Sequence, residues 1–95
     1  MSEAGIEKGC RLYALKRGCP SFKLQGGTAG DPDRLFLLPR NRCLLVEFKT
    51  LDGRLSPRQV VRHDQLERAG HRVVVVRSTQ QFRAALDLLL QALVD

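Results

Sequence analysis

The sequence contains no tryptophan and few other aromatic residues, with one Tyr and four Phe in a chain of 95 residues. Proteins that hold single-stranded nucleic acids commonly stack the bases on exposed aromatic rings. A hydrophobic core should need most of the rings available here. We therefore expect any contact with a nucleic acid to depend on the charge and shape of its backbone, not on reading bases.

Cysteine is also scarce. Cys10, Cys19 and Cys43 are an odd number, and no two of them form a C-x-x-C pair. Disulfide frameworks and zinc sites need closer and more regular spacing. The three thiols are therefore expected to be reduced and to behave as small apolar side chains.

The chain is short and has no long apolar run. A domain of this size buries roughly 60 to 65% of the surface of its unfolded chain, which leaves room for one core, so residues 1–95 are expected to form a single domain. No apolar run approaches the roughly 18 to 20 residues that cross a bilayer. The first five residues also lack the basic and apolar regions of a signal peptide. We expect a cytoplasmic protein of a phage or bacterium, or a nuclear one in a eukaryote, with no membrane partner.

Positive charge is plentiful. Lys and Arg number 16 against 10 Asp and Glu, which gives a formal net charge of +6. This excess favours a polyanionic partner such as DNA, although charge alone does not identify it. The residues expected to contact phosphates include Arg11, Lys23, Arg40, Arg54 and Arg58.

Hydrophobic periodicity and turn residues predict seven elements. They are a helix over residues 2–17, strands over 21–24, 33–38 and 43–49, a helix from 57 to a stop at Gly70, a strand over 73–76 and a helix from 79. A glycine-rich loop over 26–32 is expected to be flexible. This order indicates an α/β fold with a mixed sheet.

Two helix starts carry local signals. Ser56, Pro57 and Gln59 have the pattern of a capping box with proline at the first helical position, and Ser78 and Gln81 repeat the box. Between these helices, the valine run over 73–76 indicates a strand buried on both faces. The last helix is apolar on more than one stripe, which suits either burial in its own core or a subunit interface.

Glu47 is the first residue with unusual surroundings. It lies inside the run Leu44-Leu45-Val46-Glu47-Phe48-Lys49, where an ionised carboxylate is costly unless a cation compensates it. Lys49 is two residues further on and shares its strand face. An ion pair at a strand edge is the ordinary alternative explanation.

Asp33 begins the strand that should pair with the strand of Glu47. A four-residue turn between the two strands would place Asp33 opposite Phe48, on the wrong face, whereas a three- or five-residue turn places it opposite Glu47 or Lys49. We predict an odd turn length, or a bend at Asp33. Two carboxylates beside a lysine could hold Mg²⁺ or Mn²⁺ and support hydrolysis of a phosphodiester.

The order of these motifs resembles a known nuclease superfamily. Gly30-x-Pro32-Asp33, Glu47-x-Lys49 and Gly53-x-x-Ser56-x-x-Gln59 are similar to the PD-(D/E)XK pattern. The early helix bearing Glu7 and the later Leu66-x-x-x-Gly70-x-x-Val73 and Ser78 resemble the VRR-NUC (virus-type replication-repair nuclease) family. The resemblance runs from about residue 7 to residue 78 and implies a restriction-endonuclease-like α-β-β-β-α-β core with a C-terminal helix.

The resemblance also implies roles for individual residues. Asp33 and Glu47 correspond to the metal-binding carboxylates, the Phe48 carbonyl to a further metal ligand, and Lys49 to the catalytic lysine. Glu7 corresponds to a first-helix glutamate near the metal, although from the residues alone it would be a solvated helix position.

Three residues of the second predicted helix have open or divergent roles. Gln59 corresponds to a motif glutamine near the active site, and its capping position explains it as well. Arg62 departs from the family, whose members often have an aromatic residue there. His63 shares a helix face with Gln59 and could approach the substrate, or simply be packed or exposed to solvent.

Family members of this minimal length resemble Holliday-junction resolvases of DNA repair. The resemblance therefore implies a Mg²⁺-dependent endodeoxyribonuclease that acts on branched DNA as a homodimer. Two alternatives remain from the sequence: a non-catalytic basic module that binds nucleic acid, and a dimeric protein-interaction domain that uses the last helix.

Overall fold

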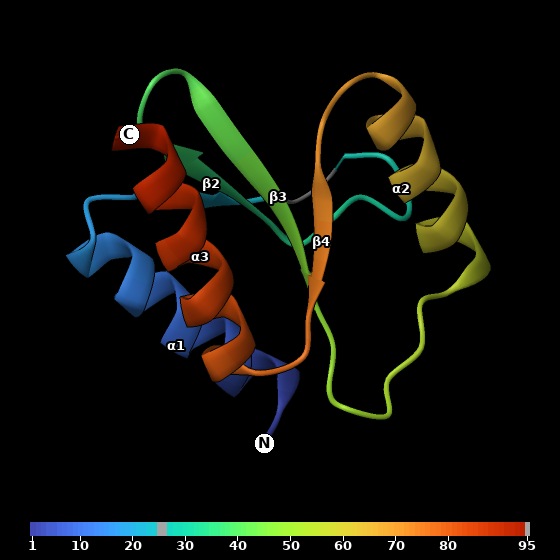
Figure 1. Cartoon of the computed structure of the whole chain (residues 1–95). Helices are drawn as coiled ribbons and strands as arrows, with labels where there is room; N and C mark the ends of the chain where they lie inside the picture. Colours follow the sequence, from blue (N-terminus) through green and yellow to red (C-terminus); the bar gives the residue numbers. More distant parts are fainter. Residues whose placement is uncertain (25–26, 95) are drawn as a thin grey trace.

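The computed structural model describes residues 1–24 and 27–94 of the chain. Its elements are α1 (Glu3–Lys16), β1 (Ser21–Lys23), β2 (Arg34–Leu38), β3 (Arg42–Phe48), α2 (Pro57–Arg68), β4 (Val73–Val76) and α3 (Thr79–Val94), as Figure 1 shows. The predicted order of helices and strands is confirmed, with bounds that shift by one or two residues. The glycine-rich loop predicted to be flexible includes Gly26, which lies outside the described residues.

The capping residues set the start of α2. The Ser56 side chain accepts a hydrogen bond from the Gln59 backbone, and the Gln59 side chain accepts one from the Ser56 backbone, so the predicted capping box is complete. Beyond its last turn, Gly70 has a φ of 93°, a left-handed conformation that glycine adopts readily.

The second capping box forms only in part. Ser78 Oγ accepts from the Gln81 backbone N–H at 3.0 Å, as predicted. The Gln81 carboxamide oxygen, however, accepts from the Arg77 backbone N–H at 2.8 Å and not from Ser78. The glutamine thus caps the residue before the N-cap, and the start of α3 is tied to the end of β4.

The sheet has the order β1-β2-β3-β4, in which only β3 and β4 are parallel. Helix α2 makes the crossover connection that a parallel pair requires. The β2–β3 hairpin pairs Leu38 with Arg42 through a turn of three residues, Pro39 to Asn41. Arg40 and Asn41 have φ values of 59° and 61°, the left-handed conformation typical of tight hairpin turns. The predicted odd turn length is confirmed.

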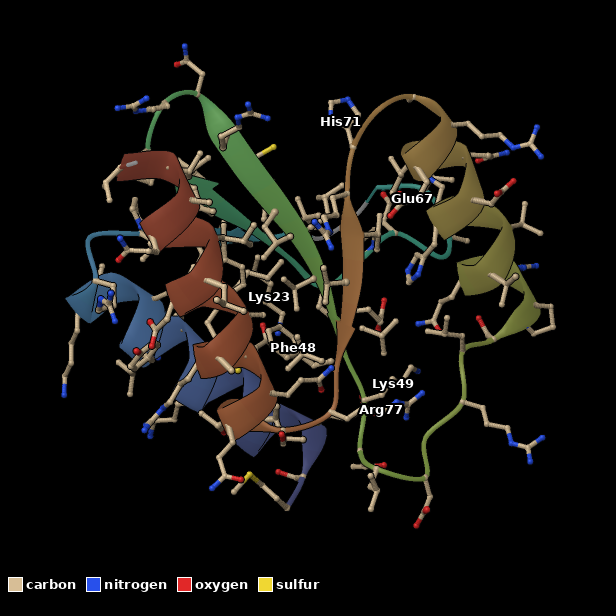
Figure 2. The ribbon with its side chains drawn as sticks, viewed as in Figure 1. Lys23, Phe48, Lys49, Glu67, His71 and Arg77 are labelled. Carbon is tan, nitrogen blue, oxygen red and sulfur yellow. The ribbon has the colours of Figure 1, made fainter. Side chains whose placement is uncertain are left out.

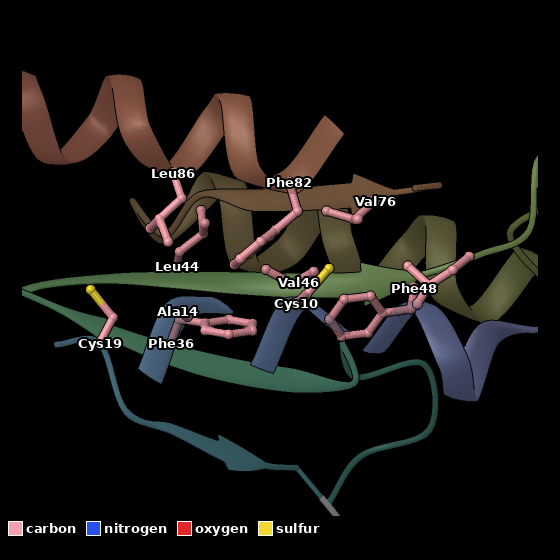
Figure 3. Packing of buried hydrophobic residues seen from close by; sticks show 11 residues of the cluster. Cys10, Ala14, Cys19, Phe36, Leu44, Val46, Phe48, Val76, Phe82 and Leu86 are labelled. Atoms are coloured by element: carbon pink, nitrogen blue, oxygen red, sulfur yellow. The ribbon is translucent and has the colours of Figure 1, made fainter. Parts of the chain in front are cut away.

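Helices cover both faces of the sheet. Phe36, Val46 and Phe48 point from one face into the core, together with buried residues of α1 and α3, as Figure 3 shows. The rings of Phe36 and Phe82 lie 5.0 Å apart between their centroids. Helix α2 lies across the other face, as the separation of the helices in Figure 1 shows. Side chains that alternate with the core residues along β3 therefore point toward α2.

The expected burial of β4 on both faces is wrong, and the apolar surface of α3 is only partly used by the core. Only Val76 of β4 is fully buried, because β4 is an edge strand whose outer side has no neighbouring strand. In α3, Phe82 and Leu86 are buried in the core, whereas Leu88 is 74% exposed. The core therefore accounts for part of the apolar surface of α3 and leaves part of it open.

The cysteines are reduced, as expected from their number and spacing. All three thiols are free, and burial raises the pKa of Cys10 to about 12, so this thiol stays protonated and apolar in character. Within residues 1–24 and 27–94, no helix has the length and hydropathy needed to span a bilayer.

Candidate active site

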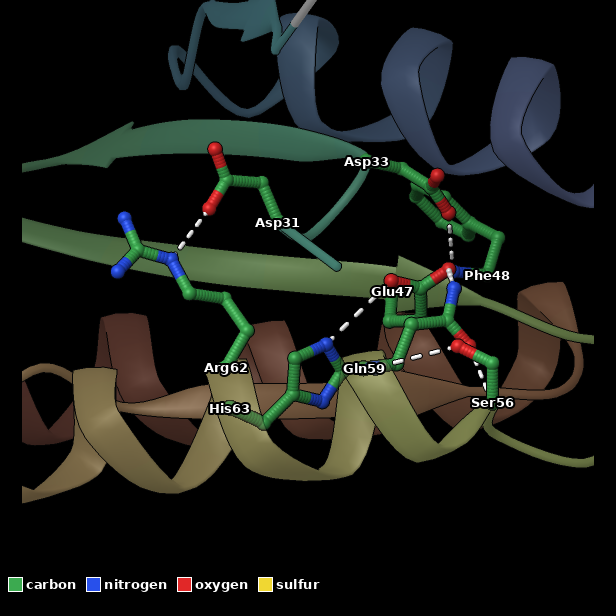
Figure 4. Close-up of polar contacts among 8 residues, drawn as sticks. All are labelled: Asp31, Asp33, Glu47, Phe48, Ser56, Gln59, Arg62 and His63. Carbon is green, nitrogen blue, oxygen red and sulfur yellow. Dashed lines mark hydrogen bonds and ion pairs between the residues drawn. The ribbon is translucent and has the colours of Figure 1, made fainter. Parts of the chain in front are cut away.

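Glu47 is the central residue of the site. It follows Val46 and precedes Phe48, both core residues, so its side chain points to the opposite face, toward α2. It is only 2% exposed, yet it is a carboxyl group. Gln59 Nε2 donates to Glu47 Oε2 at 3.2 Å, and His63 Nε2 lies 3.4 Å from Glu47 Oε1. Figure 4 shows Glu47 between Asp33 and these two side chains of α2.

Asp33 reaches Glu47 from the neighbouring strand. The register that pairs Arg34 with Val46 places Asp33 opposite Glu47 when it is continued by one residue. The backbone bends at Asp33, and its Oδ2 accepts a hydrogen bond from the Phe48 N–H at 2.7 Å. The odd turn and the bend, predicted as alternatives, therefore both occur.

Asp33 contributes to an unusual protonation of Glu47. The pKa of Glu47 is raised from 4.5 to about 8, first by burial and then by the Asp33 charge and a hydrogen bond with Asp33, while the charge of Lys49 acts to lower it. Without a cation, one proton is therefore retained near neutral pH in this part of the sheet.

A divalent cation fits the donor chemistry of this pair. The Phe48 N–H points to Asp33, and the Lys49 N–H points the opposite way, to the Val76 carbonyl of β4. The carbonyl of a residue points away from the N–H of the next residue in a strand, so the Phe48 carbonyl is on the Asp33 side of β3. Two carboxylates and this carbonyl could hold Mg²⁺ or Mn²⁺, which keep water in their remaining positions. Among the described residues no group of three or more His, Cys, Asp or Glu side chains is placed to hold a metal.

Lys49 lies at the end of β3, next to these carboxylates. In the described part of the chain its ammonium makes no ion pair, so the predicted alternative of a Glu47–Lys49 pair is not what the structure contains. Its N–H donates to the Val76 carbonyl at 3.0 Å, which fixes the backbone from which the side chain extends.

Arg77 holds the turn that follows Lys49. Its Nη1 donates to the carbonyls of Thr50 at 2.8 Å, Gly53 at 2.6 Å and Leu51 at 3.3 Å. Figure 2 shows Arg77 and Lys49 at the same end of the sheet, with His71 at the other end. The guanidinium thus fixes a segment that leads from the lysine toward Arg54 and α2. The sequence contained no signal for this contact.

The segment before Asp33 is fastened to α2. Arg62 Nε lies 2.6 Å from Asp31 Oδ1, and the Thr28 N–H donates to Asp31 Oδ2 at 2.9 Å. Gly30 has a φ of 91°, and a side chain there would collide with the Arg58 carbonyl. The departure from the family at Arg62 therefore has a physical role, since the arginine pairs with an aspartate two residues before Asp33.

The structure places Glu7 away from the carboxylate pair. Its carboxylate lies 3.1 Å from Arg34 Nε and 3.9 Å from Lys23 Nζ. Arg34 follows Asp33 along the strand, so its side chain lies on the other face of the sheet, the same face as Phe36. Glu7 therefore contacts the face of the sheet that α1 covers. Burial and Asp33 are the main causes of the raised Glu47 pKa, and the charge of Glu3 on α1 makes a smaller contribution in the same direction. Sequence reasoning missed Glu3, although it lies one helical turn before Glu7.

His63 is buried next to Glu47, so of the expectations left open for it, exposure to solvent is excluded. It is 8% exposed, and burial lowers its pKa. Its spacing of four residues from Gln59, on the same helix face, was the signal available in the sequence.

The basic residues expected to contact DNA lie on different elements. Arg54 lies between Lys49 and α2, and Arg58 lies in the first turn of α2. Arg40 lies in the hairpin turn, at the other end of β3, as Figure 1 shows. Lys23 is near Glu7, and Arg11 is half-buried on α1.

Known proteins share this sequence pattern. The sequence profile of the VRR-NUC domain family matches residues 9–80 of the chain. The chain is 35% identical over 77 residues to a protein named "Putative nuclease p44" from Acyrthosiphon pisum secondary endosymbiont phage 1. That match covers 80% of this chain and 83% of the phage protein.

Solved structures share the fold. One described as a VRR-NUC domain has a TM-score of 0.82 and 29% identity, over 90% of this chain and 94% of its own. A second, described as a VRR-NUC domain protein, has a TM-score of 0.78 at 17% identity, over 96% of this chain and 89% of its own, and shows the fold alone. The predicted α-β-β-β-α-β core with a mixed sheet and a C-terminal helix is confirmed. By its sequence profile and its fold, the chain belongs to the VRR-NUC (virus-type replication-repair nuclease) family.

Proposed function

We propose that the protein is a divalent-metal-dependent endonuclease that hydrolyses phosphodiester bonds in DNA. The observation that carries the proposal is the meeting of Asp33 and Glu47 at the end of β3, with Lys49, which makes no ion pair within the described residues, two residues further along than Glu47. Two adjacent carboxylates are poorly suited to a site that only binds anionic DNA, because they repel it. They suit a site that first binds a cation.

The side chains have distinct roles in this proposal. Asp33, Glu47 and the Phe48 carbonyl would hold the metal, which when bound stabilises charge on the phosphate and acidifies water. Lys49 would orient the attacking water or donate to a phosphate oxygen. Gln59 fixes Glu47 through its 3.2 Å hydrogen bond. Glu3 would add negative charge near the metal, and Glu7 would stabilise the fold through Arg34.

The substrate proposed is branched DNA, cut by a homodimer. Symmetric cutting of two strands needs two sites related by a two-fold axis. Leu88 and Val94 of α3 are 74% and 67% exposed, which provides apolar surface for pairing two copies. Arg54 and Arg58, in the segment that leads from Lys49 into the first turn of α2, would contact phosphates.

A panel of labelled DNA substrates tests the proposal. The protein is incubated with a four-way junction, a fork and a linear duplex, each with Mg²⁺, Mn²⁺ or EDTA. We expect cleavage with either metal, strongest on the junction, and none with EDTA. Binding that is equally strong in EDTA, without cleavage under any condition, would instead indicate a non-catalytic DNA-binding module.

A further inference from the structure

Helix α2 presents two polar side chains to one carboxylate. Gln59 and His63 are one helical turn apart, and each lies next to a different oxygen of Glu47, at 3.2 Å from Oε2 and 3.4 Å from Oε1 respectively. Of the described residues of α2, His63 alone is fully buried. If this position served only to pack the helix on the sheet, an apolar side chain would serve better.

The facing atoms of His63 and Glu47 are buried and are not hydrogen-bonded. His63 Nε2 and Glu47 Oε1 lie 3.4 Å apart, and among the described residues neither has a hydrogen-bond partner. A buried polar atom without a partner is costly, and a small shift that aligns these two atoms would satisfy both. A proton on Nε2 would make the imidazole the donor and the carboxylate the acceptor.

We infer that His63 is a positioning residue that, together with Gln59, fixes the orientation of the Glu47 carboxylate. The inference rests on the proposed function, because the carboxylate so fixed is the proposed metal ligand. With Gln59 donating to Oε2 and a protonated His63 Nε2 facing Oε1, the carboxylate would not rotate freely about its last bond. Its remaining lone pairs are then held toward Asp33 and the Phe48 carbonyl. Groups behind a metal ligand commonly set its orientation and the affinity for the metal.

The position of the His63 Nε2 atom, which faces Glu47, distinguishes this residue from a metal ligand and from a catalytic base. Its Nε2 points at the Glu47 oxygen, and the described side chains include no three-residue metal-binding group that contains it. In this role it acts through Glu47.

Three substitutions separate this role from simple packing. The amide nitrogen of glutamine can reach the place of Nε2, whereas that of asparagine reaches only the place of Nδ1. Leucine fills the space without any donor. His63→Gln, His63→Asn and His63→Leu are therefore compared with wild type, and His71→Gln, in an exposed turn at the other end of the sheet, serves as the matched control.

The affinity for Mn²⁺ alone is measured by calorimetry without DNA, and the fold by circular dichroism. We expect affinity to fall about 10- to 100-fold in His63→Asn and His63→Leu, the range seen when groups behind a metal ligand are removed. It should change by less than about threefold in His63→Gln and His71→Gln. If His63→Leu does not fold, the contrast between His63→Gln and His63→Asn remains decisive.

Equal affinity in all folded variants would overturn the inference and leave the proposed function standing, provided that wild type binds Mn²⁺ and cleaves DNA. If wild type neither binds the metal nor cleaves DNA, the proposed function fails, and the role of His63 fails with it.

Discussion

The carboxyl group of Asp33 meets that of Glu47 at the bend in the backbone just before β2, where the Asp33 N–H still donates to the Val46 carbonyl of β3 at 3.0 Å. Their closeness depends on the three-residue hairpin turn and on the hydrogen bond from the Phe48 N–H to Asp33. An arrangement of this kind costs stability in the metal-free protein, because like charges in a buried site repel. Several measurable consequences follow from that cost.

The stability of the metal-free protein should depend on pH through Glu47. Its pKa is raised from 4.5 to about 8 in the folded protein, so the folded state holds a proton that the unfolded state has lost between these values. The free energy of unfolding should therefore fall as pH rises through this window. Urea denaturation in EDTA at about pH 5 and about pH 8.5 measures it. Glu47→Gln, which cannot ionise, should lose less stability, and an equal loss in both proteins would contradict the assignment.

Metal binding should have the opposite pH dependence. Ionised carboxylates are the form that binds Mg²⁺ or Mn²⁺, so the increase in melting temperature on adding Mn²⁺ should be larger at about pH 8.5 than at about pH 5. Differential scanning fluorimetry measures the increase. Asp33→Asn should reduce it at both pH values, and an undiminished increase in this variant would place the metal elsewhere.

Glu3 and Glu7 should differ in what their loss affects. Glu7→Gln leaves Arg34, whose side chain is 12% exposed, without its ion-pair partner, so the fold should lose about 1 to 3 kcal/mol. Cleavage per folded molecule should be retained. Glu3→Gln should leave stability nearly unchanged and weaken Mn²⁺ binding about two- to fivefold, as expected for an exposed charge. Urea denaturation and calorimetry separate the two effects, and the reverse pattern would restore Glu7 to the metal site.

Arg62 and Asp31 should be energetically coupled. A double-mutant cycle with Asp31→Ala, Arg62→Ala and both changes should give a coupling of about 1 kcal/mol, because both side chains are partly buried. The single variants should also cleave more slowly, since the pair holds the segment that leads to Asp33. Arg68, paired with Asp64 on the exposed side of α2, provides the control cycle, for which the coupling should be about 0.3 to 0.5 kcal/mol.

Arg77→Lys should loosen the turn after Lys49. An ammonium cannot replace a guanidinium that reaches the Thr50, Leu51 and Gly53 carbonyls, so stability should fall by about 1 to 2 kcal/mol. Hydrogen exchange should accelerate in residues 50–53 more than in the hairpin turn. Uniform acceleration across the chain would mean that Arg77 acts on the fold as a whole.

The parts of the fold that depend on local signals could be predicted from the sequence. Ser56, Pro57 and Gln59 determine the start of α2 through contacts within four residues, and the capping box forms as expected. The odd hairpin turn could be predicted because the chemistry required Asp33 to lie level with Glu47. Both inferences use short stretches of chain.

What could not be predicted depends on packing between distant elements. Glu3 and Glu7 share a face of α1, one turn apart, so which of them approaches the carboxylates is decided by the position of α1 along its axis, which the core contacts of Ile6 and Cys10 help to set. The reach of Arg77 to the turn after β3 joins residues 24 to 27 positions apart. The burial of β4 was overestimated because its sequence does not show that it lies at the edge of the sheet.

The central claim is that Asp33, Glu47 and Lys49 form a metal-dependent hydrolytic site. The most direct test is cleavage of a labelled four-way junction in Mn²⁺ by wild type, Asp33→Ala, Glu47→Ala and Lys49→Ala, with folding of each variant checked by circular dichroism. Wild type should cleave and lose all activity in EDTA, while each variant should fold, bind the junction and leave it intact. Cleavage by folded Asp33→Ala or Glu47→Ala at the wild-type rate would contradict the claim.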